Sequence, residues 1–304
     1  GANVAILAGE TKIIATDGGA GSGVVYDVLT DVNLAGTTKT AALTNAGALS
    51  NQGTVTVGVD DTGYDVKFFG ATAGKYALWD ESADSWIISG TQSTVTAGTS
   101  NYIAGVNAGN SIASGGNYNV TIGDEAGTAI TTGDGNIAIG YQAADALSTG
   151  IRNIAIGKTA LGAATTSDYN TAVGYEAMGL NTTGTRNTAF GVQALYTNVD
   201  GDNSVAIGYE ALFTQDPASN VDMYNTAVGY SAGKLVTTGT NNTFVGGLAG
   251  DATTTGAYNT AVGSDALGTN TTGATNDAFG YYALNANTTG STNVAVGSRS
   301  LMAN

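Results

Sequence analysis

The stretch Asn170–Met178, which reads Asn-Thr-Ala-Val-Gly-Tyr-Glu-Ala-Met, is one copy of a phrase that recurs through the second two-thirds of the chain. The phrase is Asn-x-Ala-(Ile/Val/Phe)-Gly-x-x-Ala, and eleven copies of it, some imperfect, run to the end. Its glycines recur every 17 residues, with one step of 21, at Gly123, Gly140, Gly157, Gly174, Gly191, Gly208, Gly229, Gly246, Gly263, Gly280 and Gly297. A fixed period of this size predicts a solenoid whose neighbouring repeats bury one another.

The strand at the centre of each phrase has apolar residues on both faces. Alternation places Ile137 and Ile139 on one face and Ala138 on the other. We expect the Ile/Val face to line the inside of the coil. The alanine row then needs a second, close neighbour, so we expect it to face a symmetry axis in a homotrimer.

Glycines and asparagines mark the corners of the expected coil. The glycine after the strand permits φ > 0, and a second corner carries Thr-Thr-Gly or a variant ten residues later. The asparagine that opens the strand can stack on its copies, amide to amide. With a strand spacing of ~4.8 Å, eleven coils make a rod of roughly 50 Å.

The first 118 residues read differently. Residues 1–52 hold short strands (Val4–Leu7, Lys12–Ala15, Val24–Leu29) and form an expected attachment region. Residues 53–90 predict an antiparallel meander with strands near Thr54–Val59, Tyr64–Phe69, Tyr76–Trp79 and Trp86–Ile88. Residues 91–118 are a transition that holds an imperfect first copy, Asn101–Gly105, and residues 119–304 form the rod. The predicted fold class is therefore all-β, with antiparallel strands followed by a parallel β-solenoid of about eleven 17-residue coils.

The composition narrows the range of possible functions. The chain of 304 residues has no cysteine and no histidine, so disulfides, thiol chemistry and the usual neutral-pH general base are absent. A net charge of −15 argues against nucleic acid and anionic membrane surfaces as partners. No apolar run reaches the ~20 residues of a membrane span. We predict no enzyme activity, no cofactor and no metal.

Two features are candidate receptor-binding sites. Tyrosine follows the first glycine at Tyr141, Tyr175, Tyr209, Tyr230 and Tyr281, where a row of rings could stack on sugars. The sixth repeat has four extra residues around Gln215–Asp222 and includes Asp216 and Pro217; insertions in solenoids emerge as loops. Corner packing and a tolerated surface loop are the plainer interpretations.

Three local motifs have simpler explanations. Gly19–Gly23 lacks the lysine and the helix of a phosphate loop, so we interpret it as a turn. Asp60, Asp61 and Asp65 lack the spacing of a calcium loop, so we interpret them as turn residues. Asn181, Asn270 and Asn287 begin Asn-Thr-Thr, which matches a glycosylation acceptor but is also the corner of the repeat.

The repeats resemble those of phage tail fibre proteins, on copies such as Asn170–Met178 and Asn259–Leu267 joined by Asn-Thr-Thr-Gly. In many of those proteins the repeats precede a self-cleaving intramolecular chaperone, which would explain a chain that ends after the last repeat. The segment Asn203–Gly208 is also similar to the head repeats of trimeric autotransporter adhesins, which implies a trimeric parallel β-roll.

We therefore expect a structural fibre of a virion, a tail or head fibre. It would be a homotrimer that binds other virion proteins through its N-terminal part and contacts a host-surface glycan or protein through its rod. The alternatives are a bacterial surface adhesin and a polysaccharide-degrading tailspike. The latter needs a pair of carboxylates roughly 5–10 Å apart, and the sequence singles out no such pair.

Overall fold

The computed structural model describes residues 97–303 and five short strands before them. Strand β1 (Ile14–Thr16) pairs antiparallel with β2 (Val25–Asp27). Strands β3 (Val66–Phe69), β4 (Tyr76–Asp80) and β5 (Ser85–Ser89) form a three-stranded sheet in that order. All five overlap predicted strands.

Several N-terminal predictions lie outside the described residues. They are the strands Val4–Leu7 and Thr54–Val59, the Gly19–Gly23 turn, and Asp60, Asp61 and Asp65.

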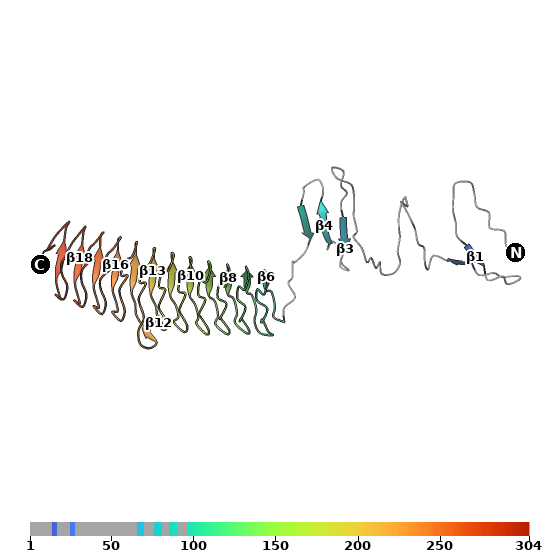
Figure 1. Cartoon of the computed structure of the whole chain (residues 1–304), viewed down its shortest axis with the longest axis horizontal. Helices are drawn as coiled ribbons and strands as arrows, with labels where there is room; N and C mark the ends of the chain where they lie inside the picture. Colours follow the sequence, from blue (N-terminus) through green and yellow to red (C-terminus); the bar gives the residue numbers. More distant parts are fainter. Residues whose placement is uncertain are drawn as a thin grey trace. The chain divides into compact units, whose positions relative to one another are not determined.

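The rest of the described chain is a parallel β-solenoid, drawn as a row of coils in Figure 1. One strand from each coil joins a twelve-stranded sheet, and residues 97–303 contain no helix. Its strands are β6 (Tyr102–Ala104), β7 (Val120–Ile122), β8 (Ile137–Ile139), β9 (Ile154–Ile156), β10 (Thr171–Val173), β11 (Thr188–Phe190), β13 (Val205–Ile207), β15 (Thr226–Val228), β16 (Thr243–Val245), β17 (Thr260–Val262), β18 (Asp277–Phe279) and β19 (Val294–Val296). The predicted parallel solenoid with its 17-residue period is thus confirmed.

The register of this sheet is unbroken. Ala172 pairs with Ala155 on one side and Ala189 on the other, and the same alignment holds across the 21-residue step, where Ala206 pairs with Ala227. Strand β6 also pairs in register, Tyr102 with Val120. The solenoid therefore begins before residue 119 and includes the copy that the sequence places in the transition.

The two faces of each strand point the opposite way from the one that the sequence analysis predicts. The alanine row lies inside the coil, with 0% exposure at Ala138, Ala172 and Ala206. The flanking residues point outward, as at Ile154 and Ile156 beside Ala155. The expectation that the alanine row faces a symmetry axis is wrong. The interior of a coil is narrow, so the strand contributes its smallest side chain there.

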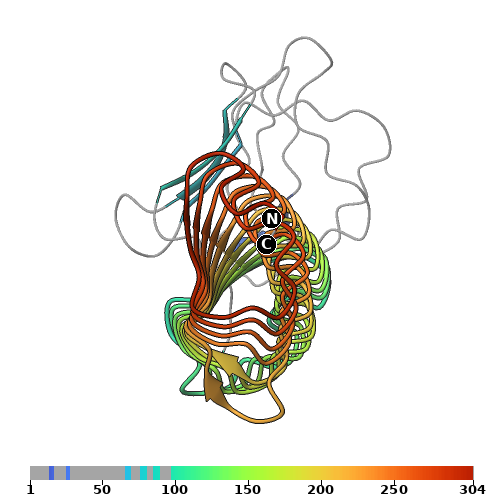
Figure 2. The same ribbon diagram turned by 90° about the vertical axis from the view of Figure 1, so that its left-hand side faces the viewer.

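The alanine row packs against a second apolar wall inside the coil. That wall comes from the Ala and the Leu or Met that follow the first corner, such as Ala177 and Met178, and both are fully buried. End on, the coils superpose as a flattened loop around this core (Figure 2). Each coil buries too little alone, and stacking makes the core continuous.

The asparagine ladder forms, but with backbone partners. The Oδ1 of Asn136 accepts the backbone N–H of Asn153 at 2.9 Å, and its Nδ2 donates to the Gly150 carbonyl at 2.8 Å. The expected amide-to-amide bond is longer, 3.1 Å from Asn153 Nδ2 to Asn136 Oδ1. Each buried amide thus ties a strand to the next coil and to its own second corner.

The two corner glycines are required for different reasons. Gly174 has φ of +137°, as predicted, and a Cβ there would lie 2.4 Å from the Gly191 carbonyl oxygen. Gly150 at the second corner needs no positive φ, but its Cβ would lie 2.2 Å from the Ser167 carbonyl oxygen. Close approach between coils excludes a side chain at the first corner and leaves little room at the second, where Ser167 is fully buried at the position that Gly150 holds in the coil before.

Many non-glycine residues hold left-handed backbone, up to three in one coil. Glu176, Met178 and Arg186 have φ of 53°, 52° and 57°. Such residues cost of order 1–2 kcal/mol each. They also direct N–H groups to neighbouring coils: Glu176 donates to Lys158 of the coil before, and Met178 to Ala194 of the coil after, each at 3.0 Å. The residues with left-handed backbone are therefore also residues whose N–H groups hydrogen-bond one coil to the next.

Candidate functional site

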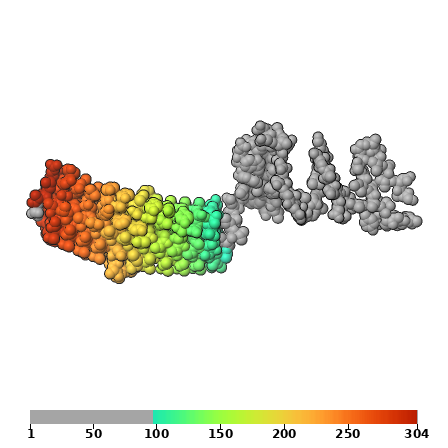
Figure 3. All heavy atoms as spheres, viewed as in Figure 1, coloured from blue at the N-terminus to red at the C-terminus, as the bar shows by residue number. Residues whose placement is uncertain are grey.

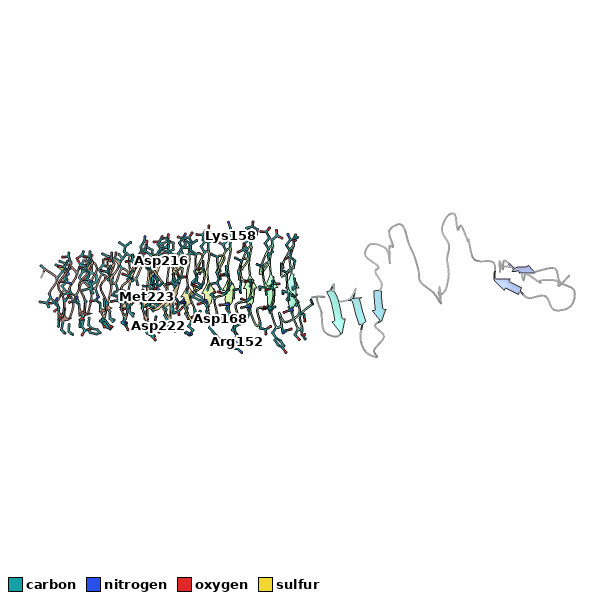
Figure 4. The ribbon with its side chains drawn as sticks, turned by 90° about the horizontal axis from the view of Figure 1, so that it is seen from below. Arg152, Lys158, Asp168, Asp216, Asp222 and Met223 are labelled. Atoms are coloured by element: carbon teal, nitrogen blue, oxygen red, sulfur yellow. The ribbon has the colours of Figure 1, made fainter. Side chains whose placement is uncertain are left out.

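The tyrosine row lies on the surface, at the corner that follows each strand. Tyr141, Tyr175, Tyr209, Tyr230 and Tyr281 are 42–59% exposed. Gaps in the row are filled by other residues, and Lys158 Nζ lies 5.9 Å from the Tyr141 ring centroid and 5.7 Å from that of Tyr175. Figure 4 shows Lys158 and Arg152 on opposite edges of the rod, so the tyrosine row follows one edge.

The faces of several of these rings are already covered. Tyr209 stacks on Tyr230 with centroids 5.4 Å apart, and Lys158 occupies the space between Tyr141 and Tyr175. A sugar would have to displace these contacts to stack there. Receptor binding by the tyrosine row stays a prediction.

The predicted insertion leaves the coil as a small projection, drawn beside the rod in Figures 2 and 3. Strands β12 (Gly201–Asp202) and β14 (Val221–Asp222) pair in parallel at its base. Gln215 is fully buried and Pro217 is buried, whereas Asp216 and the following residues 218–220 are exposed. Gln215 therefore cannot contact a receptor in this fold, and of the three predicted residues only Asp216 has an exposed side chain.

The Asn-Thr-Thr corners lie in the core. Asn181 and Asn270 are fully buried and Asn287 is 4% exposed. Asn287 Nδ2 donates to Asn270 Oδ1 at 3.0 Å, so these amides form a second ladder inside the coils. A glycan on any of them is incompatible with the folded rod.

A surface hollow that the sequence did not indicate lies beside the tyrosine row. Its volume is about 310 Å³, and it opens where Gly162 and Gly179 leave two successive coils without a side chain. Equivalent positions in other coils carry Asp145, Tyr196 and Phe213. The signal was present in the sequence as a break in this column, but the column is too variable to be recognised without the coil geometry.

The hollow is bordered by carboxylates and an aromatic ring. Asp145 lies at one end, Glu176 at the side and Tyr196 at the other end. Gln193 Nε2 donates to Glu176 Oε2 at 2.7 Å. The Tyr175 hydroxyl also hydrogen-bonds Glu176, which raises the pKa of Tyr175. Glu176 is thus held in a fixed orientation at the rim.

Burial raises the pKa of the Asp145 carboxyl, and the nearby charge of Glu125 adds to the effect, although backbone N–H groups of Asp145 and Ala146 oppose it. Because the folded chain holds this proton more tightly, its stability falls as pH rises above the ordinary value of 3.8. We expect Asp145→Asn to raise the melting temperature relative to the parent at pH 7 and to lose that advantage near pH 3. Thermal unfolding at both pH values measures it. An advantage that is the same at both would contradict the assignment.

Among residues 97–303 no three acidic side chains are grouped as metal ligands. No helix that could cross a membrane is found in the described segments.

Comparisons of the chain with protein-family models, with curated proteins and with solved structures find no match. The structure alone therefore defines the class: the chain is an all-β repeat protein built on a parallel β-solenoid.

Proposed function

We propose that this chain is a structural fibre of a virion, a tail or head fibre, that assembles as a homotrimeric rod. Its rod would project from the particle and contribute to attachment to the host surface, and its N-terminal part would bind other virion proteins. The resemblance of the repeats to phage tail fibres supports the setting. A chain without histidine or cysteine supports a structural role over an enzymatic one.

The observation that carries the assembly is an apolar column, half-buried to exposed, on the outer face of the long sheet. This column is the last residue of each strand of the long sheet from β7 onward: Ile122, Ile139, Ile156, Val173, Phe190, Ile207, Val228, Val245, Val262, Phe279 and Val296. It runs the length of the sheet, and Phe190 is 56% exposed. Contiguous apolar surfaces of this extent mark interaction sites.

Charge favours a second copy of the same chain on this face. Of the outward residues that open or close the strands β7 to β19 of the long sheet, Asp277 alone is charged. Copies with a net charge of −15 repel one another elsewhere, so this face is where they approach with the smallest penalty. The 17-residue period also repeats the same contact along the rod.

Replacing Phe190 by aspartate is expected to dissociate the assembly and leave the coil folded. A charge buried without a partner in an interface costs about 3–5 kcal/mol, roughly a hundredfold or more in the dissociation constant. Mass photometry or light scattering measures the oligomer, and circular dichroism checks the fold. Leu235→Asp is the matched control, because Leu235 is 44% exposed but lies outside the column.

Ala172→Lys tests which face of the strand lies inside the coil. It places a charge in the core, where Ala172 is fully buried, so we expect loss of the fold itself. A folded Ala172→Lys protein would contradict this placement of the alanine row. A parent protein that stays monomeric at micromolar concentration would contradict the proposed trimer.

A further inference from the structure

We propose that the hollow over Gly162 and Gly179 is a saccharide-binding site that accepts one sugar ring. As a binding site it stands on its own geometry, and only its role in host attachment rests on the proposed fibre function.

The hollow forms where two successive coils both lack a side chain in this column, at Gly162 and Gly179. The third glycine of the column, Gly268, is a single one between Asp251 and Asn285. A Cβ on Gly162 would lie 3.4 Å from Asp145 Oδ1, and a Cβ on Gly179 would lie 2.8 Å from Tyr196 Cε2. The Asp145 carboxylate therefore lies against Gly162, and the Tyr196 ring lies against Gly179. The floor between them is open because neither coil fills it.

The polar groups at the rim demand a ligand that donates hydrogen bonds. Asp145 and Glu176 carry carboxylates, which only accept hydrogen bonds when ionised. Hydrogen bonds to ionised groups are stronger than neutral ones. Since Glu176 is already oriented by Gln193 at 2.7 Å, its remaining acceptor sites are fixed in direction. Sugar hydroxyls on adjacent carbons supply such donors.

The remaining wall is apolar and suits the C–H face of a pyranose. Ala163 and Leu180 line it, and Leu180 is 42% exposed. Tyr196 closes the end, and its ring is held in place by stacking on Phe213 with centroids 5.3 Å apart. An aromatic ring with one apolar face and a polar tip is suited to a ligand that is partly apolar and partly hydroxylated.

This site is better prepared than the tyrosine row. The rings of Tyr209 and Tyr230 cover each other, and Lys158 lies between Tyr141 and Tyr175. The hollow is open without any rearrangement. Pre-formed concave sites lose less free energy to ordering on binding.

The size predicts weak binding by a single sugar. At about 310 Å³ the hollow is at the lower limit of ligand pockets. A ligand of one ring is expected to bind with a dissociation constant of order millimolar. In an oligomer the same site would be repeated, and multivalent contact with a glycan surface would raise the avidity by roughly 10²-fold or more.

Saturation-transfer NMR on the full chain tests the site with five probes: D-glucose, D-galactose, D-mannose, N-acetyl-D-glucosamine and D-glucosamine. We expect transfer to at least one of them. Gly162→Asn should reduce binding at least tenfold by filling the floor. The fold already accepts an asparagine at the equivalent Asn285, and the φ of Gly162 is outside the left-handed region.

Gly247→Asn is the matched control, because a Cβ there meets nothing within 4 Å and the residue lies outside the hollow. Asp145→Asn is a second variant that removes the charge without filling space, and it should weaken binding severalfold. Circular dichroism and the oligomeric state of each sample are measured together, so a failure of assembly is distinguished from a failure of sugar binding.

Three results would overturn the proposal. They are no transfer to any of the five sugars well above millimolar concentration, equal binding by Gly162→Asn and the parent, and binding of tetramethylammonium without any neutral sugar. The last would show that the carboxylates and Tyr196 form a cation site.

Discussion

Replacing Phe244 by alanine is expected to lower the free energy of unfolding by about 3–5 kcal/mol. Alanine is the residue found at the same position of nine other coils, so an argument from the consensus of the repeats would predict that Phe244→Ala stabilises the rod. Urea denaturation followed by circular dichroism measures the change.

The physical reason is a pair of compensating glycines. Phe244 is the largest fully buried side chain of the rod. Gly233 and Gly250 stand where six other coils have leucine, and a Cβ on Gly250 would lie 2.4 Å from Phe244 Cε1. Removing the ring therefore leaves a cavity that no neighbour fills.

The double variant Phe244→Ala, Gly250→Leu should recover much of the loss. Gly250 has φ of +58°, and Leu267 holds φ of 57° at the equivalent position of the next coil, so leucine is tolerated there. Gly250→Leu alone should destabilise the rod by overpacking. A double variant no more stable than the sum of the two single changes would contradict the coupling.

Gln215→Leu is expected to cost about 3 kcal/mol or more, although leucine is the residue at the equivalent Leu147. Gln215 is buried and its amide replaces a missing member of the asparagine ladder. Its Nε2 donates to Asn198 Oδ1 at 2.9 Å and to Ser204 Oγ at 3.0 Å. Its Oε1 accepts from Asn225 Nδ2 at 2.9 Å. Each buried polar group left without a partner costs about 1–3 kcal/mol.

The same geometry predicts that a second substitution restores the stability lost in Gln215→Leu. Ser204 stands where every neighbouring coil has the ladder asparagine, and its short side chain makes the room that Gln215 fills. Ser204→Asn combined with Gln215→Leu should restore the ladder and most of the stability. Urea denaturation and amide hydrogen exchange at Asn225 measure both effects. Gln215→Leu protein as stable as the parent would show that the amide network contributes nothing.

Such coupled substitutions are present in the sequence, but they cannot be recognised from the sequence alone. Phe244 breaks the alanine row where Gly233 and Gly250 break the leucine row, and Thr121 does the same with Gly109 and Gly127. Each of these glycines is 6 to 12 residues from the larger residue, Phe244 or Thr121, that it accommodates. Only the coil brings them into contact, since it stacks residues 17 apart and folds the strand onto the wall after the corner.

The hollow between Asp145 and Tyr196 was hidden for the same reason. Gly162 and Gly179 are unremarkable in a chain with 46 glycines. Their column becomes visible when the period is mapped onto coils. The sequence analysis instead selected Gln215, because it opens the stretch that holds the extra residues. The structure places Gln215 in the core, and the exposed part of the projection comes after it.

The sequence by itself determined the period, the parallel stacking, the corner glycines and the presence of a buried asparagine ladder, because each depends on spacing along the chain. Only the tertiary structure decided which strand face is inside. Both faces are apolar, so alternation is symmetric, and the choice depends on volume. The wall formed by residues such as Met178 and Leu195 fills most of the coil and leaves room for alanine alone. That places Val173 and Phe190 outside, on the surface where a second copy would bind.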